Sequence, residues 1–352
     1  MRISAESGKI YYEGRIDFAR KDAPTFIFAY SSAAIRFTGS AVYAYIENMH
    51  LWNDNYFGVI IDKAPLRVIQ LSNNTAERRY CLCDNLSEGE HTLCLYKLQD
   101  SPHYMRFKGF EIEGGELLAP PEAPKRRMEF YGDSVTVGAL SLATGCEASG
   151  DPMGDTGETC CAYWAYSAIT ARRLGASARL TSQGGIALLN GTGWYNEQEG
   201  FPGMEYLYNK LGYVKQLYES EWDFSLWTPQ IVVVAIEQND WRRAGQPDID
   251  PNTDENHRKL WISRYRELVL KLRSYYPKAL FICSTTIMCH DSVWDDMIGE
   301  AVESINSRRV RHFMYSKNGS GTPGHIRAAE ACKMAAELSE YIDNLPFDVW
   351  NN

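Results

Sequence analysis

A change of pattern at residues 118–124 constrains the fold of this chain more than any other feature. These seven residues contain three prolines, and such a run forms a stiff, extended connector. Before it, short β-type segments follow one another without a helical pattern between them. After it, strand-like and helix-like segments alternate. The sequence therefore predicts a β-rich unit at residues 1–117, a linker at residues 118–126 and an α/β unit at residues 127–352.

The first unit has the pattern of an antiparallel β-sandwich. Its strand-like segments are rich in β-branched and aromatic residues, and they lie at 35–37, 42–46, 57–61 and 91–96. Turn-forming residues separate them, at 38–40, 62–65, 72–74 and 87–90. Many short strands joined by turns predict a sandwich of jelly-roll type. We identify no catalytic cluster in this unit.

The second unit has the pattern of a doubly wound α/β domain. We expect strands at 127–131, 178–182, 231–236, 279–285 and 309–315, and helices at 159–174, 204–221, 257–273, 294–307 and 325–342. The run at 231–236 is apolar without alternation, as expected of a central parallel strand that is buried on both faces. This order predicts three layers, with the functional site at the carboxyl ends of the strands.

Composition narrows the classes of partner. The net charge of −9 argues against a nucleic-acid partner, and we interpret the short basic run Lys125-Arg126-Arg127 as a solvated part of the linker. No stretch approaches the ~20 apolar residues of a membrane span, and the first residues contain no apolar signal segment. Nine cysteines without a Cys-x-x-Cys pair suggest reduced thiols rather than a disulfide framework or a zinc site. We therefore expect a cytoplasmic protein without metal or cofactor, and the sequence leaves its oligomeric state open.

A candidate nucleophile follows the first strand of the second unit. Gly132-Asp133-Ser134 comes directly after the strand expected at 127–131, and a segment able to form a helix comes next. An α/β protein places a nucleophile at such a strand end. The same triplet also forms ordinary turns, so its interpretation depends on the rest of the chain.

Other polar segments fall at later strand ends. Gly184-Gly185 follows the second strand, and Asn239-Asp240 follows the central one. Taken singly, the glycines can form a turn and Asn239-Asp240 can cap the next helix. Their position in the chain order gives them a second interpretation, as parts of one site.

A candidate base lies at the start of the last helix. His325 can be a helix residue without a task, and His290 and His312 are rival bases. His312 lies inside an expected strand, which favours a structural role, whereas His290 follows a strand end.

Ester cleavage explains why these residue types belong together. The Ser134 hydroxyl needs a base within hydrogen-bond reach, and the imidazole of His325 suits that task. The oxyanion of the tetrahedral intermediate needs fixed donors, which the N–H groups of Ser134 and Gly185 and the side chain of Asn239 would supply.

The order of these blocks resembles that of the SGNH (GDSL-like) hydrolase superfamily. Ser134 matches its first block, Gly185 its second, Asn239 its third and His325 its fifth. With the β-sandwich and proline linker ahead of them, the whole chain is similar to carbohydrate esterase family 2. That resemblance implies a jelly roll before a three-layer, flavodoxin-like domain, and removal of acetyl groups from plant polysaccharides.

Two positions depart from the superfamily pattern. Glu237 stands where the third block usually has glycine, and Thr322 stands where the fifth block usually has aspartate. We therefore predict a Ser134–His325 pair without an acidic partner. The resemblance implies that a backbone carbonyl orients His325. Glu237 is a weaker candidate for this role, because it should lie near the same strand end.

Aromatic residues cluster beside these blocks. Trp194-Tyr195, Trp241 and Trp294 are candidate platforms for sugar rings, although each can equally be a core residue. The resemblance to carbohydrate esterase family 2 thus implies an acetyl esterase, and we expect it to act on acetylated manno- or xylo-oligosaccharides. Two alternatives stay open: a lipase- or thioesterase-like SGNH hydrolase, and a non-catalytic glycan-binding protein with a decayed site.

Overall fold

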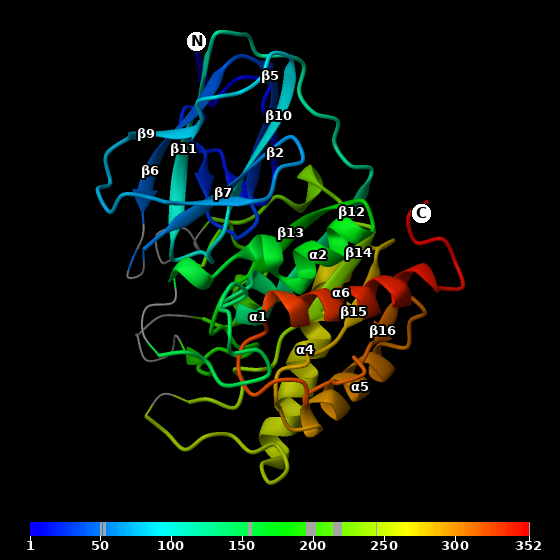
Figure 1. Ribbon diagram of the computed structural model, residues 1–352. Helices are drawn as coiled ribbons and strands as arrows, with labels where there is room; N and C mark the ends of the chain where they lie inside the picture. The colour runs from blue at the N-terminus through cyan, green and yellow to red at the C-terminus, as the bar shows by residue number, and fades with distance from the viewer. Residues whose placement is uncertain are drawn as a thin grey trace.

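The computed structural model describes residues 1–49, 51, 54–153, 157–194, 202–213, 220–243 and 245–351. An antiparallel β-sandwich is followed by an α/β domain with a parallel sheet (Figure 1), and the predicted fold class is confirmed. The strands of the sandwich are β1 (Arg2–Ser4), β2 (Tyr11–Glu13), β3 (Ile16–Asp17), β4 (Thr25–Phe26), β5 (Ser32–Thr38), β6 (Ala41–Met49), β7 (Tyr56–Ile61), β8 (Arg67–Gln70), β9 (Arg78–Cys83), β10 (Glu90–Lys97) and β11 (Tyr104–Glu113).

Two antiparallel sheets form the sandwich. One has the order β3-β4-β11-β6-β9, with β1 also paired to β11, and the other has the order β2-β5-β10-β7-β8. Buried and less buried residues alternate along β6 and β10, so each strand turns one face inward. The inner faces enclose an apolar core in which Phe37, Phe57 and Phe107 are fully buried.

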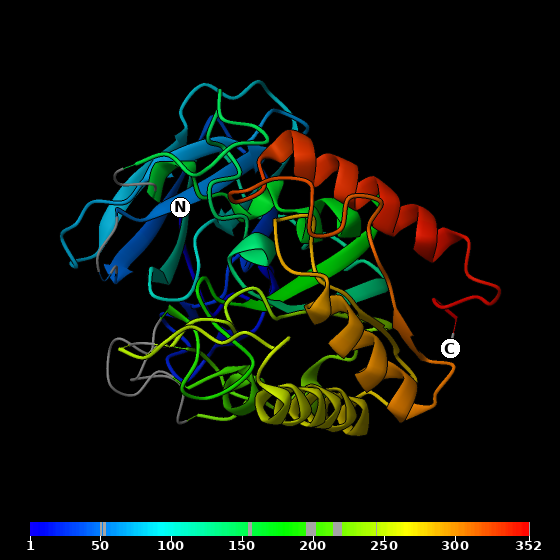
Figure 2. The ribbon, with the colours of Figure 1, turned by 90° about the horizontal axis from the view of Figure 1, so that it is seen from below.

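The α/β domain is a single parallel sheet between two helical layers. Its elements are β12 (Arg126–Gly132), α1 (Ser134–Val137), α2 (Tyr166–Arg173), β13 (Ala176–Ser182), α3 (Met204–Leu207), β14 (Ile231–Ala235), α4 (Glu255–Tyr275), β15 (Leu280–Cys283), α5 (Val293–Ile305), β16 (Val310–His312) and α6 (Ala328–Asp343). The strand order is β13-β12-β14-β15-β16. Figure 2 shows α6 on one side of this sheet and α4 with α5 on the other. The order reverses next to β12, and such a switch point is where open α/β sheets bind ligands.

Several elements differ in extent from their predicted ranges. The helix predicted at 159–174 begins at Tyr166, because residues 157–164 contain short 3₁₀ turns whose backbone is bonded elsewhere: Ala162 N–H donates to Leu98 O at 2.9 Å. The helix predicted at 204–221 ends at Leu207. Beyond it the chain makes β-type hydrogen bonds, since Trp222 N–H donates to Asn209 O at 2.8 Å; residues 214–219 lie outside the described part.

The two units share core residues. The segment at 27–30 leaves β4, and its side chains enter the two cores of the α/β domain. Arg15 of the sandwich is fully buried against Glu129 and Tyr131 of β12, at 3.1 and 2.9 Å. Residues 118–125 run between the units without a strand (Figure 1). The exact limits of the domains at 117 and 127 stay a prediction.

Candidate active site

Ser134 stands at the carboxyl end of the inner strand β12. It is the first residue of α1, and the side chain of Asp133 caps that turn by accepting from Val135 N–H at 3.0 Å. A Cβ on Gly132 would lie 2.2 Å from Thr136 Oγ1 and 2.8 Å from Ala235 O. Only glycine therefore lets the nucleophile turn sit this close to the end of β14.

Ser134, His325 and Asp151 form a continuous hydrogen-bonded chain. His325 Nε2 lies 2.8 Å from Ser134 Oγ, and His325 Nδ1 lies 2.6 Å from Asp151 Oδ2. The backbone N–H of His325 also donates to Asp151 Oδ1 at 2.8 Å. This is the arrangement of a serine, histidine and aspartate triad.

The charge of Asp151 determines the tautomer of His325. Partial burial alone would raise the pKa of Asp151, but the hydrogen bond and charge of His325, with help from Arg327, lower this pKa to about 2. An ionised carboxylate can only accept hydrogen bonds, so His325 Nδ1 carries a proton and donates to it. In the neutral imidazole Nε2 is then an acceptor, and the Ser134 hydroxyl donates to it.

Arg327 fixes the loop that carries Asp151. Its buried guanidinium donates to Asp151 Oδ1 at 3.2 Å, to Gly150 O at 3.3 Å and to the carbonyl of His325. One side chain thus bonds the backbone of both the acid-bearing and the base-bearing segment. Because a planar guanidinium presents its donors in a rigid fork, it holds the two segments at a fixed separation.

The prediction of a serine–histidine pair without an acidic partner is wrong. The acid comes from Asp151, in a loop far from His325 in sequence, and not from a backbone carbonyl. Thr322 is buried, and its hydroxyl has no hydrogen-bond partner among the described residues. Glu237 does not orient His325 either, since its carboxylate lies 3.8 Å from His290 Nδ1.

Sequence reasoning missed Asp151 because neither spacing nor periodicity connects it to His325. It lies in the irregular stretch between α1 and α2, where Gly150 and Pro152 indicate only a turn. An aspartate between two turn-forming residues is too common to single out. The contact between Asp151 and His325 depends on this loop folding back over the carboxyl edge of the sheet.

The structure also brings the predicted oxyanion residues to this edge. Gly185 follows β13 with a φ of 73°, and among the described residues no hydrogen bond involves its N–H. A Cβ on the adjacent Gly184 would be 3.7 Å from Ser134 Cβ, so the two loops are in contact. Asn239 Nδ2 donates to Ile186 O at 2.9 Å, which leaves its second N–H for another acceptor.

Asp240 anchors the same loop and does not cap a helix. Its buried carboxylate accepts from Leu188 N–H at 3.0 Å and from Leu189 N–H at 3.3 Å. Burial raises the pKa of Asp240 to about 7, although these two N–H groups favour its charged form. The next helix, α4, has Asp254 as its own N-cap.

The rival histidines are held in other networks. His290 Nδ1 lies 2.8 Å from Met288 O, and Nε2 lies 3.1 Å from Asp295 Oδ2. Burial disfavours its charged form, but Asp295 and Glu237 outweigh this and raise the pKa of His290 to about 9. Both of its ring nitrogens are thus engaged in this network instead of facing Ser134. His312 lies at the end of β16, and burial lowers its pKa.

The predicted aromatic platforms lie beside the oxyanion segment. Trp194 is 49% exposed, and its backbone N–H donates to Gly185 O at 2.9 Å. Its indole ring packs edge to face against that of Trp241. Trp241 and Trp294 both line a cavity of about 230 Å³ with Gln238. Trp294 is only 3% exposed and packs edge to face on Trp261, so it is mainly a core residue. Tyr195 lies outside the described residues.

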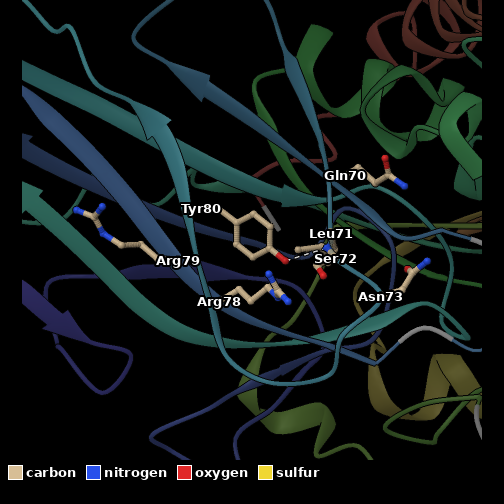
Figure 3. A pocket seen from close by; sticks show the side chains of 7 residues that line it. All are labelled: Gln70, Leu71, Ser72, Asn73, Arg78, Arg79 and Tyr80. Carbon is tan, nitrogen blue, oxygen red and sulfur yellow. Dashed lines mark hydrogen bonds between the residues drawn. The ribbon is translucent and has the colours of Figure 1, made fainter.

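A larger hollow of about 440 Å³ lies on the sandwich, between residues 70–73 and 78–80 (Figure 3). Its Tyr80 hydroxyl accepts from Ser72 N–H at 3.0 Å.

The described residues contain no group of three or more His, Cys, Asp or Glu side chains placed to hold a metal ion. Within the same part of the chain, no helix combines the length and apolar character that crossing a membrane requires.

Known proteins share both the sandwich and the α/β domain. Residues 12–121 match the family model described as "Carbohydrate esterase 2 N-terminal". A solved structure of a family two carbohydrate esterase from Clostridium thermocellum, in complex with cellohexaose, superimposes with a TM-score of 0.79 at 27% identity, covering 95% of this chain and 98% of that one. The chain belongs to carbohydrate esterase family 2.

Curated relatives of this family 2 protein extend the comparison. The chain is 30% identical over 275 residues to the cellulase/esterase CelE of Acetivibrio thermocellus. The aligned region is 78% of this chain but only 30% of CelE. The chain is also 24% identical over 346 residues to an acetylxylan esterase / glucomannan deacetylase of Cellvibrio japonicus, covering 96% of this chain and 89% of the relative.

Proposed function

We propose that this family 2 protein is a carbohydrate O-acetyl esterase with Ser134 as its nucleophile. The observation that carries the proposal is the chain of hydrogen bonds from Ser134 through His325 to Asp151, at 2.8 and 2.6 Å. A serine in this setting attacks acyl carbonyls, and relatives named as acetylxylan esterase and glucomannan deacetylase support an acetyl ester as the substrate.

The reaction proceeds through an acetyl-serine intermediate. Ser134 Oγ attacks the acetyl carbonyl while its proton moves to His325 Nε2, and Asp151 stabilises the imidazolium that forms. His325 then gives that proton to the departing sugar oxygen. In the second half, His325 takes a proton from water and the resulting hydroxide attacks the acetyl carbonyl. His325 then returns the proton to Ser134 Oγ, and acetic acid leaves and ionises in solvent.

Backbone and amide donors stabilise both tetrahedral intermediates. The N–H groups of Ser134 and Gly185 and the second N–H of Asn239 Nδ2 can meet at the oxyanion. Each such donor is worth roughly 10²–10³ in turnover when it is well placed. The exposed part of Trp194 and the cavity that Trp241 lines would provide contact surface for sugar rings.

Manno- or xylo-oligosaccharides are the sugars that we propose, by analogy with the named relatives. We also propose a cytoplasmic location, which rests on the nine cysteines being free thiols. Oligosaccharides taken up by the cell would then be the substrates.

The test compares wild type with Ser134→Ala on 4-nitrophenyl acetate. We expect the variant to lose at least about 10³-fold in kcat, while Ser320→Ala, an exposed serine near α6, keeps wild-type activity. Equal rates for wild type and Ser134→Ala would support the non-catalytic glycan-binding alternative. NMR of the products from acetylated manno- and xylo-oligosaccharides then identifies the sugar and the hydroxyl position.

Acyl-chain preference distinguishes the second alternative. A lipase- or thioesterase-like hydrolase would prefer 4-nitrophenyl octanoate to acetate. A clear preference for the acetate ester would support the acetyl esterase.

A further inference from the structure

A loop of the β-sandwich contacts the oxyanion segment of the α/β domain. This loop connects β10 to β11 at residues 98–103 and carries Asp100 and Ser101. Asp100 Oδ2 accepts from Gly184 N–H at 3.0 Å and from Gln183 Nε2 at 2.8 Å. The Ser101 hydroxyl donates to Gln183 Oε1. Both ends of the Gln183 amide are therefore held by residues of the sandwich.

The Gln183 amide in turn fixes one peptide plane. Besides its bond to Asp100, Gln183 Nε2 donates to Gly184 O at 3.2 Å. The peptide that joins Gly184 to Gly185 is planar and trans, so its C=O and the Gly185 N–H point in opposite directions. Holding Gly184 O toward the sandwich therefore directs the Gly185 N–H to the other side, where our proposed function requires an oxyanion donor.

Glycine alone would not keep this orientation. Neither Gly184 nor Gly185 has a side chain to limit rotation of the peptide between them, and Gly185 has a φ of 73°, in a region that glycine enters freely. A Cβ on Gly184 would come within 2.8 Å of Asp100 Oδ2, so the glycine also admits the carboxylate. The direction of this N–H must therefore be set by neighbouring groups.

Asp100 is itself held by its own loop and by the end of β10. His103 Nδ1 lies 3.3 Å from Asp100 Oδ1, and buried Lys97 donates to Asp100 O at 2.7 Å and to Gln99 O. The side chain of Asp100 is 18% exposed, while those of Lys97 and His103 are almost fully buried. The hydrogen bond and charge of His103, the charge of Lys97 and the Gly184 N–H outweigh burial and keep the pKa of Asp100 below its usual value.

We propose that Asp100 is a positioning residue for ester hydrolysis, which orients the Gly185 N–H through Gln183. This role rests on the proposed esterase function and deepens it. The sandwich then contributes to the catalytic geometry instead of serving only as an accessory module, since it fixes one of the oxyanion donors.

The experiment measures kcat, KM and inhibition by a boronic acid, whose tetrahedral adduct with Ser134 resembles the intermediate. For Asp100→Ala we expect kcat on 4-nitrophenyl acetate to fall by roughly 10- to 100-fold, less than full loss of a donor, with KM within about twofold. The Ki of the boronic acid should rise by a similar factor. Asp100→Asn should stay within about threefold of wild type, because its Oδ1 can still accept from both donors. Ser101→Ala should show a smaller loss of the same kind.

Tyr30→Phe is the matched control. It removes another contact between the units, from Arg172 Nη1 to the Tyr30 hydroxyl at 3.4 Å, and should leave kcat unchanged. If Asp100→Ala lowers the melting temperature but keeps kcat and boronate Ki at wild-type values, the positioning role is overturned. If wild type hydrolyses no ester at all, the proposed function fails first and this inference falls with it.

Discussion

Asp151 reaches His325 from the loop that follows the nucleophile turn. In this arrangement the acid and the base come from separate segments, and the segment before α6 carries the base alone. Thr322 is buried, and its hydroxyl has no hydrogen-bond partner among the described residues. The triad therefore depends on the placement of the loop that carries Asp151.

Replacing Asp151 by asparagine should reduce kcat by roughly 10²–10⁴-fold. The amide can present N–H to Nδ1 and so stabilise the wrong tautomer of His325, as established for triads of this type. Steady-state kinetics on 4-nitrophenyl acetate measure the effect. Asp223→Asn, which changes an exposed N-cap of a short turn, is the control. A loss below about threefold for Asp151→Asn would contradict its assignment to the triad.

Glu237 is a buried carboxyl without a hydrogen-bond partner among the described residues. Burial raises its pKa from 4.5 to about 8, and the charge of His290 opposes this only in part. The folded protein then binds more protons than the unfolded chain between these pH values, so stability falls as the pH rises through this window. Glu237→Gln removes this titration. The difference in free energy of unfolding between the variant and wild type should therefore shift in favour of the variant as the pH rises from 5 to 8.

Urea unfolding at pH 5, 6.5 and 8 measures this change. Glu303→Gln, on the exposed side of α5, should follow the wild-type curve at every pH. Because Glu237 and His290 interact, the transition in wild type belongs to the pair. Parallel curves for wild type and Glu237→Gln would show that Glu237 titrates normally.

At the scale of elements, the start of α6 organises the acid-bearing loop. Glu330 Oε2 accepts from the N–H of Arg327 at the N-cap of α6, and its Oε1 accepts from Ala148 N–H, both at 2.9 Å. A single carboxylate therefore bonds the helix end and the loop that contains Asp151. The loop has no regular structure of its own at this point.

Glu330→Ala should lower the free energy of unfolding by roughly 1–2 kcal/mol, as expected for loss of a helix-capping group. It should also lower kcat by about tenfold with little change in KM, since Asp151 would be less well placed. Chemical denaturation and steady-state kinetics test the two effects. Glu340→Ala, in the last turn of the same helix and exposed, should change neither. A stability loss without a kcat loss would separate the cap from the site.

Element types were predictable from the sequence where one pattern dominates. The apolar run that forms β14 and the alternation in β10 identify their strands directly. The segment after Leu207 is predicted to continue the helix, but there Leu211 N–H donates to Ser220 O and Trp222 N–H donates to Asn209 O, and these bonds replace helical ones. Such pairing depends on tertiary contacts, which also explains why the role of Asp151 could not be read from local sequence.

At the scale of the whole molecule, the two units are joined through buried charge. The Arg15 guanidinium donates to the carbonyls of Tyr208 and Lys210, both at 2.9 Å, as well as to Glu129 and Tyr131. The side chains of Arg15 and Glu129 are both fully buried. Arg15 of the sandwich thus neutralises the carboxylate of Glu129 inside the α/β domain.

Arg15→Ala should destabilise the protein by roughly 3–5 kcal/mol, because it leaves Glu129 buried without its cation. Urea unfolding, followed by tryptophan fluorescence and by circular dichroism, gives the magnitude and shows whether both units unfold together. Arg2→Ala removes a half-exposed partner of Glu77 and should cost less than about 1 kcal/mol. A cost for Arg15→Ala as small as that of Arg2→Ala would mean that the units are energetically independent.

The distance along the chain between nucleophile and base matters during synthesis. Ser134 and His325 are 191 residues apart, and the sandwich loop that contacts the oxyanion segment is made before either of them. A ribosome therefore completes the sandwich and the nucleophile turn well before it adds the base. Growing chains carry an unactivated serine, and hydrolytic activity appears only once the last strand and the segment before α6 have emerged and folded.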